Sequence, residues 1–225
     1  MAGLFITFEG IDGSGKSTQM RMLASALRLR GLEVVATREP GGTPFGKRLR
    51  AALLDLNENV DPLAELLLFA SDRAQHVRTL LKPALESGHM VLSDRYADAT
   101  RAYQGAGRGF SKELIADVIE LATAGLKPDL TLIFDLSVAE CVSRARRRVH
   151  DGHKGDRLDS EDAAFHTRVR EAYLEIARAE PDRVRIIDAS GSIDETHTRV
   201  MDVVMRFIKS RESGESRESI EKNAS

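Results

Sequence analysis

Five short apolar runs are spaced along the chain, and each has the length and the β-branched or aromatic content of a buried β-strand. The runs cover residues 4–8, 33–37, 90–93, 130–134 and 184–187. Between and after them, apolar residues recur at helical spacing over residues 20–29, 45–56, 62–86, 111–124, 137–149, 161–179 and 194–209. Strands that alternate with helices favour βαβ units, which place helices on both faces of a parallel sheet. The pattern therefore predicts an α/β fold of three layers around a five-stranded parallel sheet.

Two segments lack this pattern. Residues 144–157 are basic and punctuated by glycine, with no apolar stripe after Val149. Residues 211–225 are mostly Ser, Glu, Arg and Lys, a composition that buries too little apolar surface to offset the entropy of ordering. We therefore expect one domain over residues 1–210 and a disordered tail over residues 211–225.

The composition indicates the cellular compartment of the protein and the classes of partner that it is expected to bind. Among 225 residues, 35 acidic and 33 basic side chains leave a net charge of −2, which favours neither a nucleic acid polymer nor an anionic membrane surface. No apolar run approaches the span of a bilayer, and the chain enters its first strand without the apolar segment of a signal peptide. The single cysteine, Cys141, excludes an internal disulfide and suits a reducing compartment. We expect a cytoplasmic protein that binds neither nucleic acid polymer nor membrane.

The first strand leads into a complete G-x-x-x-x-G-K-[ST] sequence, which opens the first helix. Backbone N–H groups of such a loop close around phosphate oxygens, and the helix N-terminus adds unpaired donors and partial positive charge. Lys16 is expected to reach the β- and γ-phosphates, and the Ser17 hydroxyl to bind Mg²⁺. The predicted nucleotide-binding loop consists of Gly10, Ile11, Asp12, Gly13, Ser14, Gly15, Lys16, Ser17 and Thr18.

Arginines at strand ends indicate which class of phosphate-binding enzyme the chain is expected to be. The Asn-Lys-x-Asp element of a guanine-specific GTPase is absent from the sequence. Arg38 follows the second predicted strand and Arg95 the third, at the edge where open α/β sheets bind ligands. Arg73 lies one helical turn after Phe69, so the two share a face of the long helix. Cations that converge beside a phosphate loop favour a small-molecule kinase.

Two aspartates close apolar strands. Asp94 ends the third run and is predicted to be the carboxylate on the Mg²⁺ side, directly or through water. Asp135 ends the fourth run, and because Leu136 and Ser137 after it fit the start of a helix, we predict a structural role for Asp135.

Taken together, these motifs resemble those of the thymidylate kinase family. The matching segments are residues 8–18 (Phe-Glu-Gly-Ile-Asp-Gly-Ser-Gly-Lys-Ser-Thr), 37–43 (Thr-Arg-Glu-Pro-Gly-Gly-Thr), 68–73 (Leu-Phe-x3-Arg), 93–96 (Ser-Asp-Arg-Tyr), 102–105 (Ala-Tyr-Gln-Gly) and 156–159 (Asp-Arg-Leu-Asp). The resemblance covers about residues 4–208 in the family's order and leaves out the tail. It implies a P-loop nucleoside monophosphate kinase-like fold, phosphorylation of dTMP to dTDP with ATP and Mg²⁺, and a homodimer.

The resemblance also implies which residues bind the acceptor nucleotide. It assigns Asp12 to the deoxyribose 3′-hydroxyl, Arg38 and Arg95 to the dTMP phosphate, Phe69 to the thymine face, Arg73 to thymine O4, Thr100 and Gln104 to the base edge, and Tyr103 to the exclusion of a 2′-hydroxyl. An aromatic face tolerates any base, so base identity must come from hydrogen bonds and steric exclusion. The helical pattern by itself favours Phe69 as a core aromatic, and Tyr103 fits an ordinary half-buried tyrosine equally well.

The basic segment 144–157 corresponds to a lid in this resemblance. Some family members carry an arginine in the loop where Gly13 stands here, and this chain instead resembles the bacterial class in which lid arginines supply the cation. We expect Lys16, Arg95, Arg147 and Arg157 to act on the transferring phosphoryl group, and the sequence leaves open which lid arginine does so. A solvated basic helix end is the alternative for Arg147 and its neighbours.

Two other functions stay open on the sequence. A deoxynucleoside kinase shares the phosphate loop and a Glu-Pro element, and Glu39 would then act as the base toward a 5′-hydroxyl. A non-catalytic nucleotide-binding switch would bind ATP without transferring phosphate. The additional arginines argue for a monophosphate acceptor, and a pure switch needs neither Phe69 nor Arg73.

Overall fold

The computed structural model describes residues 3–54, 60–150 and 157–222. Its centre is a sheet of five parallel strands in the order β2-β3-β1-β4-β5. The strands are β1 (Leu4–Glu9), β2 (Val34–Arg38), β3 (Met90–Asp94), β4 (Leu130–Asp135) and β5 (Val184–Asp188). Because β1 pairs with β3 on one side and β4 on the other, the loop after β1 opens at the carboxyl edge of the sheet, where such folds bind ligands.

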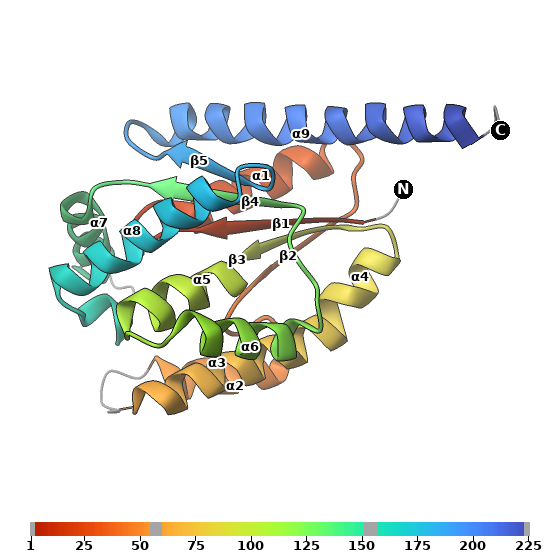
Figure 1. Cartoon of the computed structure of the whole chain (residues 1–225). Coiled ribbons are helices and arrows are strands. Elements are labelled where there is room, and N and C mark those ends of the chain that lie inside the picture. The colour runs from red at the N-terminus through yellow and green to blue at the C-terminus, as the bar shows by residue number, and fades with distance from the viewer. Residues whose placement is uncertain (1–2, 55–59, 151–156, 223–225) are drawn as a thin grey trace.

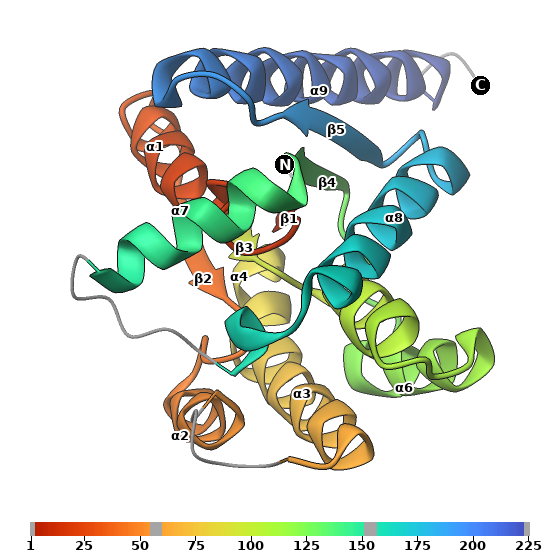
Figure 2. The same ribbon diagram turned by 90° about the vertical axis from the view of Figure 1, so that its left-hand side faces the viewer.

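Helices cover both faces of the sheet, so the chain forms three layers, as Figure 1 and Figure 2 show. On one face, α1 (Lys16–Arg28) and α9 (Ile193–Lys222) contact each other and the strands. On the other face lie α8 (Ala163–Ala179) and a continuous helical stretch made of α3 (Pro62–His76), the π-helical η1 (Val77–Leu81) and α4 (Lys82–Glu86). The remaining segments are α2 (Pro44–Leu53), α5 (Ala97–Thr100), the π-helical η2 (Arg101–Gly107), α6 (Lys112–Thr123), α7 (Val138–His150) and η3 (Leu158–Ser160).

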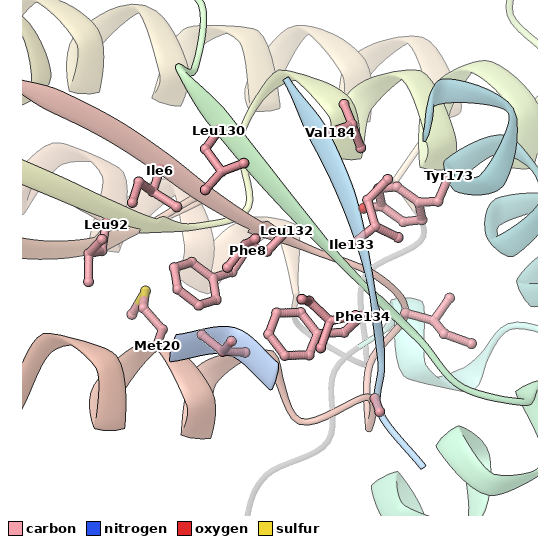
Figure 3. Packing of buried hydrophobic residues seen from close by; sticks show 14 of the residues in the cluster. Ile6, Phe8, Met20, Leu92, Leu130, Leu132, Ile133, Phe134, Tyr173 and Val184 are labelled. Atoms are coloured by element: carbon pink, nitrogen blue, oxygen red, sulfur yellow. The ribbon is translucent and has the colours of Figure 1, made fainter. Parts of the chain in front are cut away.

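Apolar side chains fill the space between these layers. Phe8 of β1 stacks on Phe134 of β4 with the ring centroids 5.8 Å apart, and Met20 of α1 belongs to the same buried cluster (Figure 3). A second cluster gathers around Phe5 and Val91. Almost every residue of β1, β3 and β4 is buried, which explains why these strands are continuous apolar runs rather than alternating ones.

The predicted elements agree well with the structure. All five strands are confirmed, and each end differs by at most one residue from the prediction. The predicted helix over residues 62–86 is confirmed as the continuous stretch of α3, η1 and α4. The pattern did not predict α5 and η2, because these short segments bury polar side chains as well as apolar ones.

The last helix extends further than its apolar pattern. The pattern predicts an end at residue 209, whereas α9 continues to Lys222, and Arg211 donates a hydrogen bond to Asp129 Oδ1 at 2.6 Å. The first residue of the predicted tail thus contacts the domain, and the disorder of residues 211–225 stays a prediction, of which 223–225 lie outside the described residues. No helix in the described part of the chain has both the length and the apolar content that crossing a bilayer requires.

Candidate active site

The loop between β1 and α1 carries the predicted phosphate site. Gly15, directly before α1, has φ 97°, and Gly13 has φ 88°, both in the left-handed region that favours glycine. A Cβ on Gly13 would lie 2.2 Å from the backbone carbonyl oxygen of Cys141 in α7. A side chain at position 13 would therefore force the backbone of α7 to move, and Lys16 is the only cationic residue in the loop sequence 10–18.

Lys16 is the first residue of α1 and folds back over the loop. Its Nζ donates a hydrogen bond to the carbonyl oxygen of Ile11 at 3.1 Å and lies 3.5 Å from Asp12 Oδ1. The side chain is only 4% exposed. The ammonium group is therefore held beside the loop's backbone N–H groups, where an anion is its natural partner.

Ser17 and Asp94 meet where α1 begins and β3 ends. The Ser17 hydroxyl donates a hydrogen bond to Asp94 Oδ2. A hydroxyl and a carboxylate are hard oxygen ligands, and Mg²⁺ typically binds one or two such groups together with water and substrate phosphates. The described residues contain no group of three or more His, Cys, Asp or Glu side chains arranged to hold a metal ion. The donor set of Ser17 and Asp94 therefore fits Mg²⁺ that arrives with a nucleotide.

Arg95 connects the phosphate loop with the neighbouring cavity. Its Nη2 donates to Asp12 Oδ2 at 2.6 Å and to the Tyr103 hydroxyl at 2.9 Å, and its Nη1 donates to the Tyr173 hydroxyl at 3.3 Å. The guanidinium carbon also lies 4.5 Å from the centroid of the Tyr103 ring. Burial alone would lower the pKa of Arg95, but the Asp12 carboxylate and the nearby tyrosines raise it well above the usual value. With φ 73°, Arg95 has a left-handed backbone, which is costly for a non-glycine residue and concentrates at functional sites.

Glu9, the last residue of β1, is buried close to Arg95. It accepts hydrogen bonds from the Tyr173 hydroxyl and from the Tyr96 backbone N–H, each at 2.8 Å. Burial, and after it the charge of Asp98, raises the pKa of Glu9 to about 8. Glu9 is therefore mainly protonated at neutral pH and does not neutralise Arg95.

Arg73 of α3 is held deep in the wall of the same region, with 2% of its side chain exposed. Its Nε donates to Glu39 Oε2 at 2.8 Å, its Nη1 to Thr100 Oγ1 at 2.8 Å, and its Nη2 to the Tyr96 carbonyl oxygen at 2.9 Å. Since Glu39 also contacts His76 Nδ1 at 2.9 Å, the carboxylate is itself fixed. The guanidinium group is thus oriented before any ligand arrives.

A cavity opens beside the phosphate loop. It is lined by Asp12, Phe69, Arg73, Arg95, Thr100, Tyr103 and Gln104, together with Glu39, Pro40, Arg50, Leu54, Ala99 and Leu158. All of the predicted acceptor-binding residues except Arg38 therefore line one space. The cavity offers an aromatic face, fixed hydrogen-bonding groups and, on the side of the phosphate loop, a cation.

Three predicted arginines lie outside this lining. Arg38 ends β2 opposite Asp94 of β3 and is exposed, and Arg147 is exposed on α7. Arg157, which precedes η3, donates from Nη2 to Glu65 Oε2 at 2.6 Å and from Nε to the Leu53 carbonyl oxygen at 3.3 Å. Their contacts to phosphate stay predictions, and residues 151–156 of the predicted lid lie outside the described residues.

Asp135, for which the sequence predicts a structural role, contacts α8. Its two carboxylate oxygens accept hydrogen bonds from Arg170 of α8, from Nε at 2.7 Å and from Nη2 at 2.9 Å. Ser137 caps the following helix, because its Oγ accepts the Glu140 backbone N–H at 3.3 Å.

The acidic residue that holds Gln104 was not predicted from the sequence. Glu65 is completely buried in α3 and accepts hydrogen bonds from Gln104, Arg108 and Arg157. The available signal was a lone glutamate inside the apolar stretch at residues 63–69, because a charge that a helix must bury requires partners.

Comparison with known proteins agrees with this geometry. The thymidylate kinase family model matches residues 8–200. The thymidylate kinase of Halothermothrix orenii is 50% identical over 200 residues, covering 89% of this chain and 95% of that protein. For the thymidylate kinase of Pelobacter propionicus the identity is 46% over 207 residues, covering 91% and 94%. The crystal structure of thymidylate kinase from Ehrlichia chaffeensis matches with a TM-score of 0.72 at 35% identity, over 91% of this chain and 99% of that one. This P-loop α/β chain therefore belongs to the thymidylate kinase family.

Proposed function

We propose that this protein transfers the γ-phosphoryl group of ATP to dTMP, producing dTDP and ADP. The observation that carries the proposal is the position of Arg95, which contacts Asp12 of the phosphate loop and Tyr103 of the cavity at the same time. An acceptor phosphate bound to Arg95 would lie next to a nucleotide whose phosphates bind Lys16. Such an arrangement would hold the two reacting phosphates next to each other, so the transfer would not depend on a bimolecular encounter.

Electrostatic stabilisation, rather than proton transfer, is the main chemical requirement. The second pKa of a phosphate monoester is about 6, so the acceptor oxygen is largely ionised near neutral pH and needs no general base. Arg95 neutralises the acceptor phosphate, and Lys16 neutralises the β- and γ-phosphates of the donor. Both cations are already fixed by hydrogen bonds, so they need little reorganisation during transfer.

The cavity wall suits a deoxyribonucleotide with a thymine base. Phe69 supplies a face for stacking, while Arg73 and Gln104 supply hydrogen-bonding groups. Tyr103 is held by Arg95 and packs edge-on against Tyr173, with the ring centroids 6.4 Å apart. A tyrosine fixed in this way would exclude a 2′-hydroxyl by steric contact.

Ser17 and Asp94 would hold Mg²⁺ with the nucleotide, and the ion would then neutralise charge on the β- and γ-phosphates. Arg38 would add positive charge on the acceptor side of the sheet edge. Arg147 and Arg157 are the candidates for a cation supplied by the lid.

Glu39 does not support a deoxynucleoside kinase. It is buried, and its two oxygens bind Arg73 and His76. Glu39 lines the cavity, but a general base needs an oxygen available to the hydroxyl that it deprotonates, and both of its oxygens are engaged. Glu39 instead fixes the group that is proposed to bind the thymine.

An assay of ADP release with dTMP, thymidine or no acceptor tests the proposed function. We expect turnover with dTMP, and with thymidine only the rate seen without acceptor. Comparable turnover with thymidine would indicate the deoxynucleoside kinase. ATP binding without ADP release in any mixture would indicate the non-catalytic switch.

We also propose that the protein is a cytoplasmic homodimer. Leu63 and Leu67 of α3 are 47% and 54% exposed, and Leu114 and Leu121 of α6 are 39% and 78% exposed. Because α3 and α6 contact each other, these leucines lie on neighbouring helices. A two-fold dimer that pairs this surface with its copy would remove the leucines from water.

A further inference from the structure

Glu65 is a buried carboxylate at the centre of contacts from three segments. Gln104 of η2 donates its Nε2 to Glu65 Oε1 at 2.8 Å, whereas Arg108 Nη2 and Arg157 Nη2 donate to Oε2 at 3.0 and 2.6 Å. Arg108 Nε makes a longer contact with Oε1, at 3.2 Å. Burial alone would raise the pKa of Glu65, but the hydrogen bonds from Arg108, Gln104 and Arg157 lower it overall. Glu65 is therefore ionised at neutral pH and acts only as an acceptor.

Gln104 is the member of this cluster that lines the cavity. The oxygen and nitrogen of a glutamine amide point in different directions, and its hydrogen-bond partners decide which atom lies where. Because Glu65 only accepts, it holds the NH₂ group of Gln104 and leaves the amide oxygen as the acceptor offered to a ligand. A reversed amide would place its oxygen against a buried carboxylate, which is strongly unfavourable.

We propose that Glu65 is a positioning residue that sets the base preference of the acceptor site through Gln104. An amide oxygen in the cavity favours a pyrimidine whose N3 carries a hydrogen, as in thymine and uracil. Cytosine presents a lone pair at N3, so two acceptors would face each other without a donor between them. The inference rests on the proposed placement of the base edge beside Gln104.

The two arginines on Oε2 determine what the substitution Glu65→Gln would do. Their two donors on Oε2, at 3.0 and 2.6 Å, would keep the oxygen of the new amide on their side. The new NH₂ group would then face Gln104, and the longer contact from Arg108 Nε to Oε1 would be lost. The Gln104 amide would then turn to accept from that group and present its own NH₂ to the cavity. The substitution would thus convert the base-reading acceptor into a donor, which suits the N3 lone pair of cytosine.

The test is the ratio of kcat/KM for dTMP to kcat/KM for dCMP, measured on one preparation of each variant. Both values scale with the amount of folded enzyme, so a loss of stability alone does not change the ratio. We expect Glu65→Gln to lower the ratio by about 100-fold, because a site built for one hydrogen-bonding group strongly rejects its mismatch. An unchanged ratio would overturn the proposal.

Asp98→Asn is the matched control. Asp98 is also a buried carboxylate bound by arginine, with Arg183 Nη1 2.7 Å from Oδ2, but it does not belong to the described lining of the cavity. The control should keep the wild-type ratio. A decrease as large as that of Glu65→Gln would show that any disturbed buried carboxylate has this effect, and would overturn the proposal.

Gln104→Leu separates this inference from the proposed function. A wild-type ratio in Gln104→Leu would contradict the placement of the base. A collapsed ratio in Gln104→Leu with a wild-type ratio in Glu65→Gln would contradict only the role of Glu65.

If Glu65→Gln does not fold, Glu65→Asp is the second variant. Its side chain keeps the negative charge but is shorter by one methylene group, so it should lower the ratio by a smaller factor. A wild-type ratio in that variant would also overturn the proposal.

Discussion

Single residues in this site act through partners that hold them in place. Arg95 is bound by Asp12 and Tyr103, and Arg73 by Glu39 and Thr100. A free arginine side chain would lose much rotamer entropy on binding a ligand, and these contacts remove most of that loss in advance. The carboxylates of Asp12 and Glu39 therefore contribute to the recognition of an anion as much as the arginines that they hold in place.

Replacement of Arg95 tests the central electrostatic claim. Arg95→Ala should lower kcat by roughly 10² or more, because it removes a preorganised cation beside the transferring group. Steady-state kinetics at saturating dTMP and ATP measure the effect. Arg101→Ala is the control from the neighbouring segment, because that guanidinium binds Asp98 and Glu180 and should change kcat little. Normal turnover in Arg95→Ala would show that the acceptor phosphate binds elsewhere.

Glu9 makes the stability of the fold depend on pH. Its pKa is about 8 in the folded protein, against an ordinary glutamate value of 4.5, so the folded state favours the neutral carboxyl group. A raised carboxyl pKa contributes stability that is complete below about pH 4.5 and is lost as the pH rises toward 8. Glu9→Gln stays neutral, so it should be more stable than wild type at pH 9, by on the order of 1–3 kcal/mol. Thermal melts of both proteins between pH 5 and 9 check this, and parallel curves would contradict it.

At the scale of elements, the strands were predictable and the cavity wall formed by α5 and η2 was not. Three strands are buried on both faces, and this produces continuous apolar runs that stand out in the sequence. The phosphate loop was equally evident, because its glycines are required by a backbone that closes around phosphate. Both signals are local, so neither depends on knowing the rest of the fold.

Segments α5 and η2 show why the rest could not be predicted from periodicity. They carry Thr100, Tyr103 and Gln104, and all three side chains are buried although two of them are polar in type. Their burial follows from contacts with Arg73, Arg95 and Glu65, which come from distant parts of the chain. The π-helical turn of η2 also departs from the spacing that a helical pattern assumes, and such turns occur frequently at functional sites. Only the family resemblance pointed to these residues.

At the scale of the whole molecule, the parallel sheet brings the ligand-binding groups to one edge. Lys16 begins α1 after the loop that follows β1, Asp94 ends β3 with Arg95 directly after it, and Arg38 ends β2. Strand order places β3 between β2 and β1, so these groups are neighbours although they are far apart in the sequence. The opposite surface of α3, which carries Arg73 and Glu65 inside, holds the exposed Leu63 and Leu67.

The exposed leucines predict how the protein assembles. If α3 and α6 form the dimer surface, wild type should have twice the 24.8 kDa mass of one chain. Leu67→Lys should shift the mass toward that of one chain, because a lysine and its symmetry-related copy would bring two charges into a desolvated contact. Light scattering after size-exclusion chromatography, over a range of loading concentrations, measures this mass.

Leu29→Lys controls for the loss of an exposed leucine in general. Leu29 is 89% exposed at the end of α1, on the other face of the sheet from α3. This variant should keep the mass of the dimer.

Because α3 also carries Arg73, separation of the subunits should raise the KM for dTMP more than it lowers kcat, through a looser cavity wall. A Leu67→Lys variant that stays dimeric would move the interface elsewhere, whereas a wild-type protein with the mass of one chain at every concentration would exclude the dimer itself.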